Sequence, residues 1–419
     1  MEKLTIIGGV PLIGELAVQG AKNSSLPLLA AAMLVKGKTV LHNCPDLTDV
    51  DAACKILSYL GCRIRREGST VEIDASRVDR YDVPDDLMRE MRSSIVFLGA
   101  IAARMNAAQI SFPGGCELGP RPIDLHLMGL RQLGLRIKEG YGLLDCELRS
   151  KRFVGSRISF SFPSVGATEN VIIAAATALG RTVITNAAQE PEIVALAEFL
   201  NQCGAKIYGA GESTIVIEGV PVLSETEFRV IPDRIVAVTY LCAAAATGGE
   251  VLLTDVLTDQ LDSVFPVLDQ MGCKLRITDR SVYLKAPLRL KAVKPIRTMP
   301  YPGFPTDAQA PVMTVTALAS GTSMFVENVF ENRYKHVSEL VRMGANIKVE
   351  GKVAVVEGVN SLYGASVEST DLRGGAALVI AGLAASGTTT ISNLYHIDRG
   401  YERIEQNLAG LGGRIHREA

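Results

Sequence analysis

The chain has 419 residues, and its 43 Lys and Arg nearly balance its 45 Asp and Glu. This length exceeds one ordinary hydrophobic core and predicts two domains. The balanced charge excludes a broad basic surface for nucleic acid or anionic membrane, so an anionic ligand needs a local cluster of cations.

One helix ending recurs six times along the chain. An apolar residue or a Cys is followed by Gly, and a strand-like segment comes next. Gly just after a helix permits the left-handed turn that ends it. These glycines are spaced 73, 70, 68, 72 and 68 residues apart, at Gly61, Gly134, Gly204, Gly272, Gly344 and Gly412. The spacing predicts six copies of one unit of about 70 residues.

A second pattern has the same period. Strand-like segments that begin with Gly lie at residues 37–43, 180–186, 248–254, 321–328 and 387–393, with a weaker copy at 106–112. Most follow an apolar, Ala-rich helical segment, at residues 25–34, 94–103, 169–178 and 376–385. These segments are apolar on nearly all sides, which predicts buried helices inside a shell of strands.

The sixth copy lacks its last strand. Residues 4–9 have the character of that strand, so we expect the start of the chain to complete the last domain. The predicted domains are 22–229, and 230–419 together with 1–21.

Polar residues gather where the buried helices begin, and helix N-termini favour anions. They are Lys22-Asn23, Arg92, Ser164-Val165-Gly166, Asp233-Arg234, Asp307 and Asp371-Leu372-Arg373. A single Arg there is usually structural. Its recurrence in successive units favours a site for an anionic ligand in a cleft between the domains.

A loop with three Gly and three Pro in residues 113–122 joins a strand at 108–112 to a helix from Asp124. It brings the Cys116 thiol within five residues of Arg121. A lone Cys in a turn is usually incidental, and only the rest of the chain favours a chemical role.

No motif indicates a metal or a nucleotide cofactor. The five His lack metal-ligand spacing, and Gly37-Lys38-Thr39 precedes a strand, unlike a P-loop. The eight Cys include no CxxC pair, which is typical of a reducing cytoplasm. Residues 1–5 lack the apolar core of a signal peptide, and the apolar runs are too short to span a bilayer.

Several segments resemble the UDP-N-acetylglucosamine 1-carboxyvinyltransferase family of enolpyruvyl transferases. They cover the whole chain: Lys22-Asn23, residues 113–125, 164–168, 303–307, 331–333, 371–373 and 396–402. The resemblance implies an α/β fold of two inside-out barrel domains, each built from three repeats. It also implies transfer of the enolpyruvyl group of phosphoenolpyruvate to the sugar 3-hydroxyl of UDP-N-acetylglucosamine, with release of phosphate through a tetrahedral ketal. That reaction begins peptidoglycan synthesis.

The resemblance also implies a role for each matching residue. Cys116 is the acid and, as a nucleophile, the target of the epoxide phosphonate fosfomycin, and Asp307 is the base. Lys22, Arg121 and Arg399 hold phosphate, and the forked Arg333 and Arg373 hold the donor carboxylate. The sugar nucleotide is held by Asn23, Arg92, Arg121, Pro122, Ile123, Asp124, Leu125, Ser164, Val165, Gly166, Asp307 and Val329.

Two segments depart from the family pattern: Phe162-Pro163, where some members have a basic residue, and Gly374-Gly375, where others have Ala-Ser. Two alternatives stay open. One is a transferase of the 5-enolpyruvylshikimate 3-phosphate synthase type, which the Cys116 loop disfavours. The other is a non-catalytic regulator that binds a UDP-sugar, which the full set of reactive residues disfavours.

Overall fold

The computed structural model describes residues 2–113 and 123–418, which form two compact units. One unit consists of residues 20–113 and 123–231, and the other of residues 2–19 and 232–418. The domain bounds expected from the repeat, 22–229 and 1–21 with 230–419, lie close to these divisions.

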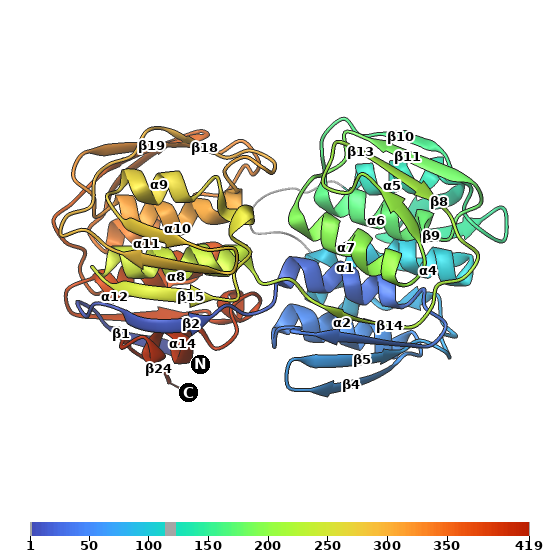
Figure 1. The fold of residues 1–419 in the computed structure, drawn as a ribbon, viewed down its shortest axis with the longest axis horizontal. Helices are drawn as coiled ribbons and strands as arrows, with labels where there is room; N and C mark the ends of the chain where they lie inside the picture. The colour runs from blue at the N-terminus through green and yellow to red at the C-terminus, as the bar shows by residue number, and fades with distance from the viewer. Residues whose placement is uncertain (1, 114–122, 419) are drawn as a thin grey trace. The chain divides into compact units, whose positions relative to one another are not determined.

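Three four-stranded sheets form the outside of the unit of residues 20–231, as far as this unit is described (Figure 1). In each sheet the first strand pairs parallel to the second, and the remaining pairs are antiparallel. The first sheet contains β14 (Thr226–Arg229), β3 (Lys38–His42), β5 (Thr70–Asp74) and β4 (Arg63–Glu67). The second contains β6 (Asp82–Val83), β7 (Ala107–Ser111), β9 (Leu143–Leu148) and β8 (Leu135–Gly140). The third contains β10 (Arg157–Ser159), β11 (Arg181–Thr185), β13 (Thr214–Glu218) and β12 (Lys206–Tyr208).

The described part of the other unit repeats this arrangement with the same strand directions. Its first sheet contains β2 (Ile13–Ala17), β15 (Glu250–Thr254), β17 (Ser281–Lys285) and β16 (Lys274–Ile277). Its second contains β18 (Ile296–Arg297), β19 (Thr322–Val326), β21 (Val353–Glu357) and β20 (Asn346–Glu350). Its third contains β22 (Ser366–Glu368), β23 (Thr388–Ser392), β1 (Lys3–Ile7) and β24 (Arg414–Glu418).

The strand at the start of the chain completes the last sheet, as the sequence predicts. β1 lies between β23 and β24, and Leu4 pairs with Ile391 on one side and with Arg417 on the other. Its side chains alternate, with Leu4 and Ile6 fully buried and Ile7 exposed. β1 is therefore an interior strand that packs on the core of its unit.

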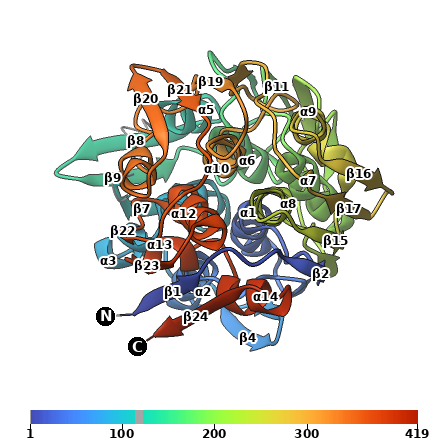
Figure 2. The ribbon, with the colours of Figure 1, turned by 90° about the vertical axis from the view of Figure 1, so that its left-hand side faces the viewer.

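In the described part of the chain, three helices fill the inside of each unit. They are α1 (Lys22–Ala32), α4 (Phe97–Met105) and α6 (Val165–Ala175) in one, and α8 (Arg234–Ala246), α10 (Thr306–Thr316) and α12 (Leu372–Ala384) in the other. Figure 2 shows α8, α10 and α12 nearly end-on, with sheets around them. Nearly all their side chains are buried, which confirms the expected buried helices. A 3-10 turn, η1 (Arg92–Val96), precedes α4 where the sequence predicts a single helix from residue 94.

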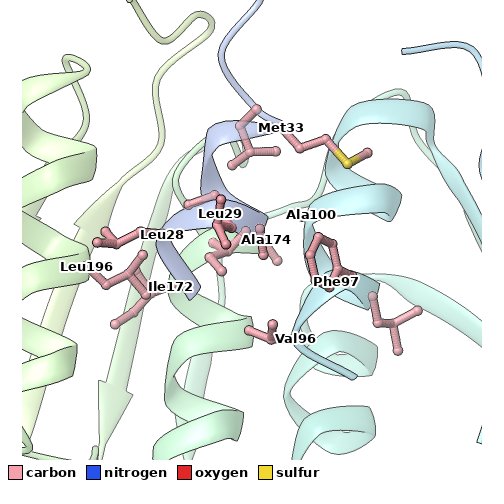
Figure 3. Close-up of a cluster of buried hydrophobic side chains, with 14 of the residues drawn as sticks. Leu28, Leu29, Met33, Val96, Phe97, Ala100, Ile172, Ala174 and Leu196 are labelled. Carbon is pink, nitrogen blue, oxygen red and sulfur yellow. The ribbon is translucent and has the colours of Figure 1, made fainter. Parts of the chain in front are cut away.

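Interdigitated apolar side chains join the helices of the unit of residues 20–231 (Figure 3). Leu28 and Leu29 of α1 pack near Phe97 of α4 and Ile172 of α6, and all four are fully buried. Burial stabilises each such side chain by roughly 1.5–3 kcal/mol. The small Ala100 and Ala174 between them let the helices approach closely.

Shorter or outer helices accompany the sheets. They are α2 (Thr48–Tyr59), α3 (Asp85–Glu90), α5 (Asp124–Gln132), α7 (Pro191–Gln202), η2 (Thr258–Leu261), α9 (Phe265–Gln270), α11 (Val337–Arg342), α13 (Tyr395–Asp398) and α14 (Ile404–Gly410). The six repeated glycines follow α2, α5, α7, α9, α11 and α14, and each has a φ between 91° and 104°. This left-handed conformation, which a Cβ disfavours, confirms their predicted role as helix ends.

We predict that the core of the second unit depends on β1. Ile6→Ala removes a fully buried side chain and should lower the free energy of unfolding by about 2–5 kcal/mol. Ile7→Ala, the matched control on the neighbouring residue, changes a side chain that is 44% exposed and should cost less than about 1 kcal/mol. Urea denaturation measures both. Equal costs would contradict the position of β1 on the core.

Candidate active site

Three ionic side chains meet at the N-terminus of α10. Asp307, the second residue of α10, accepts a hydrogen bond from Nη2 of Arg333 at 2.8 Å. Nε of Arg373 donates to the other carboxylate oxygen at 3.1 Å, and its Nη2 lies 3.1 Å from the same oxygen. Both arginine side chains are 2% exposed and Asp307 is 26% exposed, so solvent reaches the group through the carboxylate.

The N-terminus of α12 fixes Arg373. Asp371 caps this helix, and its Oδ1 accepts the backbone N–H groups of Arg373 and Gly374 at 3.0 Å. Nη1 of Arg373 donates to the Tyr401 hydroxyl at 3.1 Å, which forms a second hydrogen bond of 2.9 Å with Thr239 of α8. Burial alone would lower the pKa of Arg373, but its electrostatic interactions with Tyr401 and Asp307 outweigh burial and raise that pKa. The guanidinium is therefore charged and held in one direction.

Arg333 follows β19 in the chain and binds the first turn of α10 through two hydrogen bonds. Besides its bond to Asp307, its Nη2 donates to the carbonyl oxygen of Thr306 at 3.2 Å. Its guanidinium carbon lies 5.6 Å from the centre of the Phe330 ring, within the range of a cation–π contact. Arg333 thus binds both the backbone and the carboxylate of this turn.

In the unit of residues 20–231, predicted site residues begin two central helices. Lys22 and Asn23 open α1, and Nζ of Lys22 lies 3.4 Å from Oδ2 of Asp49. Ser164 caps α6, with its Oγ accepting the backbone N–H of Ala167 at 3.4 Å. Val165 and Gly166 follow in the first turn of α6, where helix N–H groups are available to an anion.

A buried network lies beneath this turn. The Asn170 amide nitrogen donates to the Ile95 carbonyl at 2.8 Å and lies 3.1 Å from Nδ1 of His126, while its oxygen accepts the Gly99 N–H at 2.8 Å. A Cβ at Gly166 would lie only 3.0 Å from the His126 ring. Burial, and to a smaller extent the charge of Arg92, lowers the pKa of His126 to about 4. Neutral His126 therefore accepts from Asn170 at physiological pH.

A pocket of about 370 Å³ lies in the same unit. Arg92, Ile123 and Asp124 line it, so three residues predicted to hold the sugar nucleotide share one cavity. The remaining lining comes from Phe112, Pro113, Leu127, Arg131 and Glu139.

The structure places the remaining predicted residues as follows. Leu125 is the second residue of α5, Val329 lies in the turn after β19, and Arg399 directly follows α13; all three are half-buried. Cys116, Arg121 and Pro122 lie outside the described residues.

Four neighbours of the predicted residues were not singled out from the sequence as site residues: Asp49, His126, Asn170 and Tyr401. Asn170 had a signal, because an amide inside the apolar run 169–178 must find a buried partner. Tyr401 falls in a segment that carries the family resemblance. His126 and Asp49 carry no local signal.

Among residues 2–113 and 123–418, no group of three or more His, Cys, Asp or Glu could bind a metal ion. Nor does that part of the chain contain a helix of the length and apolar character needed to cross a membrane.

The whole chain is similar to known proteins. The family model for EPSP synthase (3-phosphoshikimate 1-carboxyvinyltransferase) matches residues 6–408. UDP-N-acetylglucosamine 1-carboxyvinyltransferase 2 of Caldanaerobacter subterraneus subsp. tengcongensis is 52% identical over 415 residues, 99% of each chain. UDP-N-acetylglucosamine 1-carboxyvinyltransferase of Nitratidesulfovibrio vulgaris is 48% identical over 421 residues, covering 100% of both chains.

Solved structures agree in fold. The enolpyruvyl transferase NikO from Streptomyces tendae aligns with a TM-score of 0.90 at 26% identity, over 99% of this chain and 98% of its own. EPSP synthase from Acinetobacter baumannii aligns with a TM-score of 0.77 at 20% identity over the full length of both chains, and this likeness shows the fold alone. The fold of two inside-out α/β barrels expected from the resemblance is confirmed.

We predict that neutral His126 makes stability depend on pH. Between pH 6.5 and about pH 4 the unfolded chain binds a proton at His126 that the folded chain does not, so the free energy of unfolding falls as pH falls. From pH 7.5 to pH 5 this loss should be about 2 kcal/mol. His126→Asn keeps an acceptor for Asn170 without titrating, and should lose about 2 kcal/mol less than the unchanged chain.

Urea denaturation at the two pH values measures this difference, and the exposed His416→Asn is the control. Because other groups titrate in the same window, the difference between variants is the relevant quantity. A His126→Asn profile parallel to that of the unchanged chain would contradict a neutral His126.

Proposed function

The chain belongs to the EPSP synthase (3-phosphoshikimate 1-carboxyvinyltransferase) family, and we propose that its acceptor is UDP-N-acetylglucosamine. It is a transferase that moves the enolpyruvyl group of phosphoenolpyruvate to the 3-hydroxyl of this sugar nucleotide and releases phosphate. The observation that carries the acceptor is the full-length match to curated relatives of that name at 46–52% identity. The product commits the sugar nucleotide to peptidoglycan, and the cysteines within residues 2–113 and 123–418 form no disulfide, which supports a cytoplasmic location.

Asp307 acts as the base. A carboxylate in contact with two guanidinium groups is favoured in its ionised form, and that form accepts a proton. Its 26% exposure leaves one side open to a sugar hydroxyl.

Arg333 and Arg373 orient the carboxylate of phosphoenolpyruvate. Their planar forks match a carboxylate bidentately. Both side chains are 2% exposed and already bind Asp307. A substrate carboxylate can therefore bind them only if Asp307 gives up some of its hydrogen bonds to the two arginines. Binding of the donor and release of Asp307 toward the acceptor hydroxyl are therefore coupled events.

The remaining groups of the substrates are held by residues of the unit of residues 20–231, together with Arg399 and Val329 of the unit of residues 232–418. Lys22, with Asp49 beside it, binds phosphate together with Arg121 and Arg399. Asn23, Arg92, the first turn of α6 from Ser164 to Gly166, and Arg121 to Leu125 hold the sugar nucleotide, with Val329 from the other unit. The roles of Cys116, Arg121 and Pro122 rest on the sequence alone.

We assign the thiol chemistry to Cys116, and six of the other seven cysteines are poorly suited to it. Burial raises the pKa of five of them to about 12, namely Cys54, Cys62, Cys146, Cys203 and Cys273. Burial also raises the pKa of Cys242. A protonated, buried thiol is a poor nucleophile.

The reaction then has two balanced stages. Cys116 donates a proton to the methylene carbon of phosphoenolpyruvate, Asp307 takes the proton of the 3-hydroxyl, and the sugar oxygen bonds to the central carbon. The Cys116 thiolate then takes back a methyl proton from the resulting ketal while the bond from carbon to the phosphate oxygen breaks, and protonated Asp307 returns its proton to the departing phosphate. Phosphate leaves, and the enol ether forms.

We predict acceptor selectivity. With phosphoenolpyruvate as donor, phosphate release should depend on UDP-N-acetylglucosamine and be at least about 100-fold slower with shikimate 3-phosphate, because polar groups that fit one acceptor stay unpaired with the other. A colorimetric phosphate assay measures both rates. Preference for shikimate 3-phosphate would identify the alternative transferase. Binding of the UDP-sugar without turnover would identify a regulator.

We predict that Asp307→Asn lowers kcat by about 10²–10⁴-fold, since the amide cannot take the proton. Asp307→Glu, which keeps the charge but shifts it by one methylene, should lose less. The exposed Asp279→Asn is the control and should leave kcat unchanged. Steady-state kinetics give kcat, calorimetry gives the affinity for UDP-N-acetylglucosamine, and thermal unfolding tests the fold. A folded Asp307→Asn variant with kcat within about tenfold of the unchanged chain would exclude Asp307 as the base.

A further inference from the structure

A buried carboxylate that the proposed reaction does not use binds Thr306, the residue before Asp307. Glu327 directly follows β19, and its side chain is only 1% exposed. A carboxylate in such a place is costly unless several donors satisfy it. Glu327 has four, and they come from three separate segments of the chain.

One oxygen of Glu327 organises the turn that follows β19. Oε1 accepts the backbone N–H groups of Val329 at 2.8 Å and Phe330 at 3.1 Å. The same oxygen accepts the Thr298 hydroxyl at 2.9 Å. This turn leads directly to Arg333.

The other oxygen reaches the residue that precedes the proposed base. Oε2 accepts the hydroxyl of Thr306 at 3.1 Å, and Thr306 is the first residue of α10 and the neighbour of Asp307. A negative charge beside a helix N-terminus is also favoured by the helix dipole. One carboxylate therefore ties the first turn of α10 to the segment that carries Arg333, the partner of Asp307.

Comparison among the repeats shows that Glu327 is an addition to the common plan. In four units the residue directly after the corresponding strand is Asn or Asp with a φ near +55°, at Asn43, Asn186, Asp255 and Asn393. The side-chain amides of Asn43 and Asn186 donate to the carbonyls of Val230 and Phe160. Each of these carbonyls directly follows the first strand of its sheet, β14 or β10.

In the fifth unit Asn328 performs this task, because its amide donates to the Thr298 carbonyl at 3.2 Å. Asn43 and Asn186 directly follow their strands, whereas Asn328 is the second residue after its strand. The additional residue between the strand and Asn328 is Glu327. The turn of the repeat thus does not require Glu327. The buried carboxylate of Glu327 instead serves the first turn of α10, where it accepts the hydroxyl of Thr306.

We propose, on the basis of the function above, that Glu327 is a positioning residue for Asp307 and acts through the hydroxyl of Thr306. Arg333 grips the same turn through the Thr306 carbonyl, so Thr306 is held on both its side chain and its backbone. Removing the Glu327 contact frees the turn on one side and changes the direction of the Asp307 carboxylate. A shift of about 1 Å at a catalytic group costs on the order of 10²-fold in rate.

Two replacements of Thr306 isolate this contact. Thr306→Val has nearly the same shape but no hydroxyl, and should lower kcat at least about tenfold while KM for UDP-N-acetylglucosamine changes less than about threefold. Thr306→Ser keeps the hydroxyl and should retain kcat within about threefold. Thr314→Val removes a buried hydroxyl further along α10, where it bonds the Ala310 carbonyl at 3.1 Å, and is the control for the loss of a hydroxyl in this helix.

The measurements are steady-state phosphate release, thermal unfolding, and crystal structures of both Thr306 variants. A Thr306→Val variant with the same kcat as Thr306→Ser would overturn the proposal, whether both variants keep their activity or both lose it. In either case the rate does not depend on the hydroxyl. If the unchanged chain releases no phosphate, the proposed function fails by itself. The crystal structures then decide the positioning role, and an Asp307–Arg333 distance of 2.8 Å retained in Thr306→Val would refute it.

Discussion

Apolar helices fill the inside of each unit, and their burial limits the positions at which charged side chains are tolerated. After their first turns, α8, α10 and α12 carry side chains that are almost all buried. A charge in the middle of such a helix would lose its hydration without gaining a partner. The first turn is different, because its backbone N–H groups need acceptors and its side chains can reach solvent. The candidate site therefore gathers at helix starts as a consequence of the fold.

Charges at these starts stabilise one another. Asp371 caps α12, Arg373 of that helix binds Asp307 of α10, and Tyr401 joins Arg373 to Thr239 of α8. Buried ionic groups are tolerated when their hydrogen bonds are well satisfied, and removing one partner is costly. The same bonds fix the direction of each side chain, which is what a site needs if it is to orient a small anionic substrate.

The repeat fixes where the candidate site residues stand, and substitutions in each copy decide which functional groups they carry. Six equivalent helix starts carry Lys22, Arg92, Ser164, Arg234, Asp307 and Arg373, so one backbone plan presents an ammonium, guanidinium groups, a hydroxyl and a carboxylate. The fifth copy has Glu327 added after its strand. This copy also carries the residue to which we assign the base. Equivalent backbone positions have thus diverged in chemistry while the sheets around them kept one strand order.

The sequence by itself determined the six units, the buried helices, the glycine-ended outer helices and the unit that receives the first strand. Each of these follows from rules that act over a few residues, such as the left-handed turn after Gly61 or the apolar run of α12. The resemblance supplied candidate site residues, Asp307, Arg333 and Arg373 among them. Only the tertiary structure decided that these three bind one another, because their distances depend on the packing of α10 against α12 and on the segment after β19. It also decided that His126 is neutral and that Glu327 reaches Thr306, since burial and partners distant in sequence leave no local pattern.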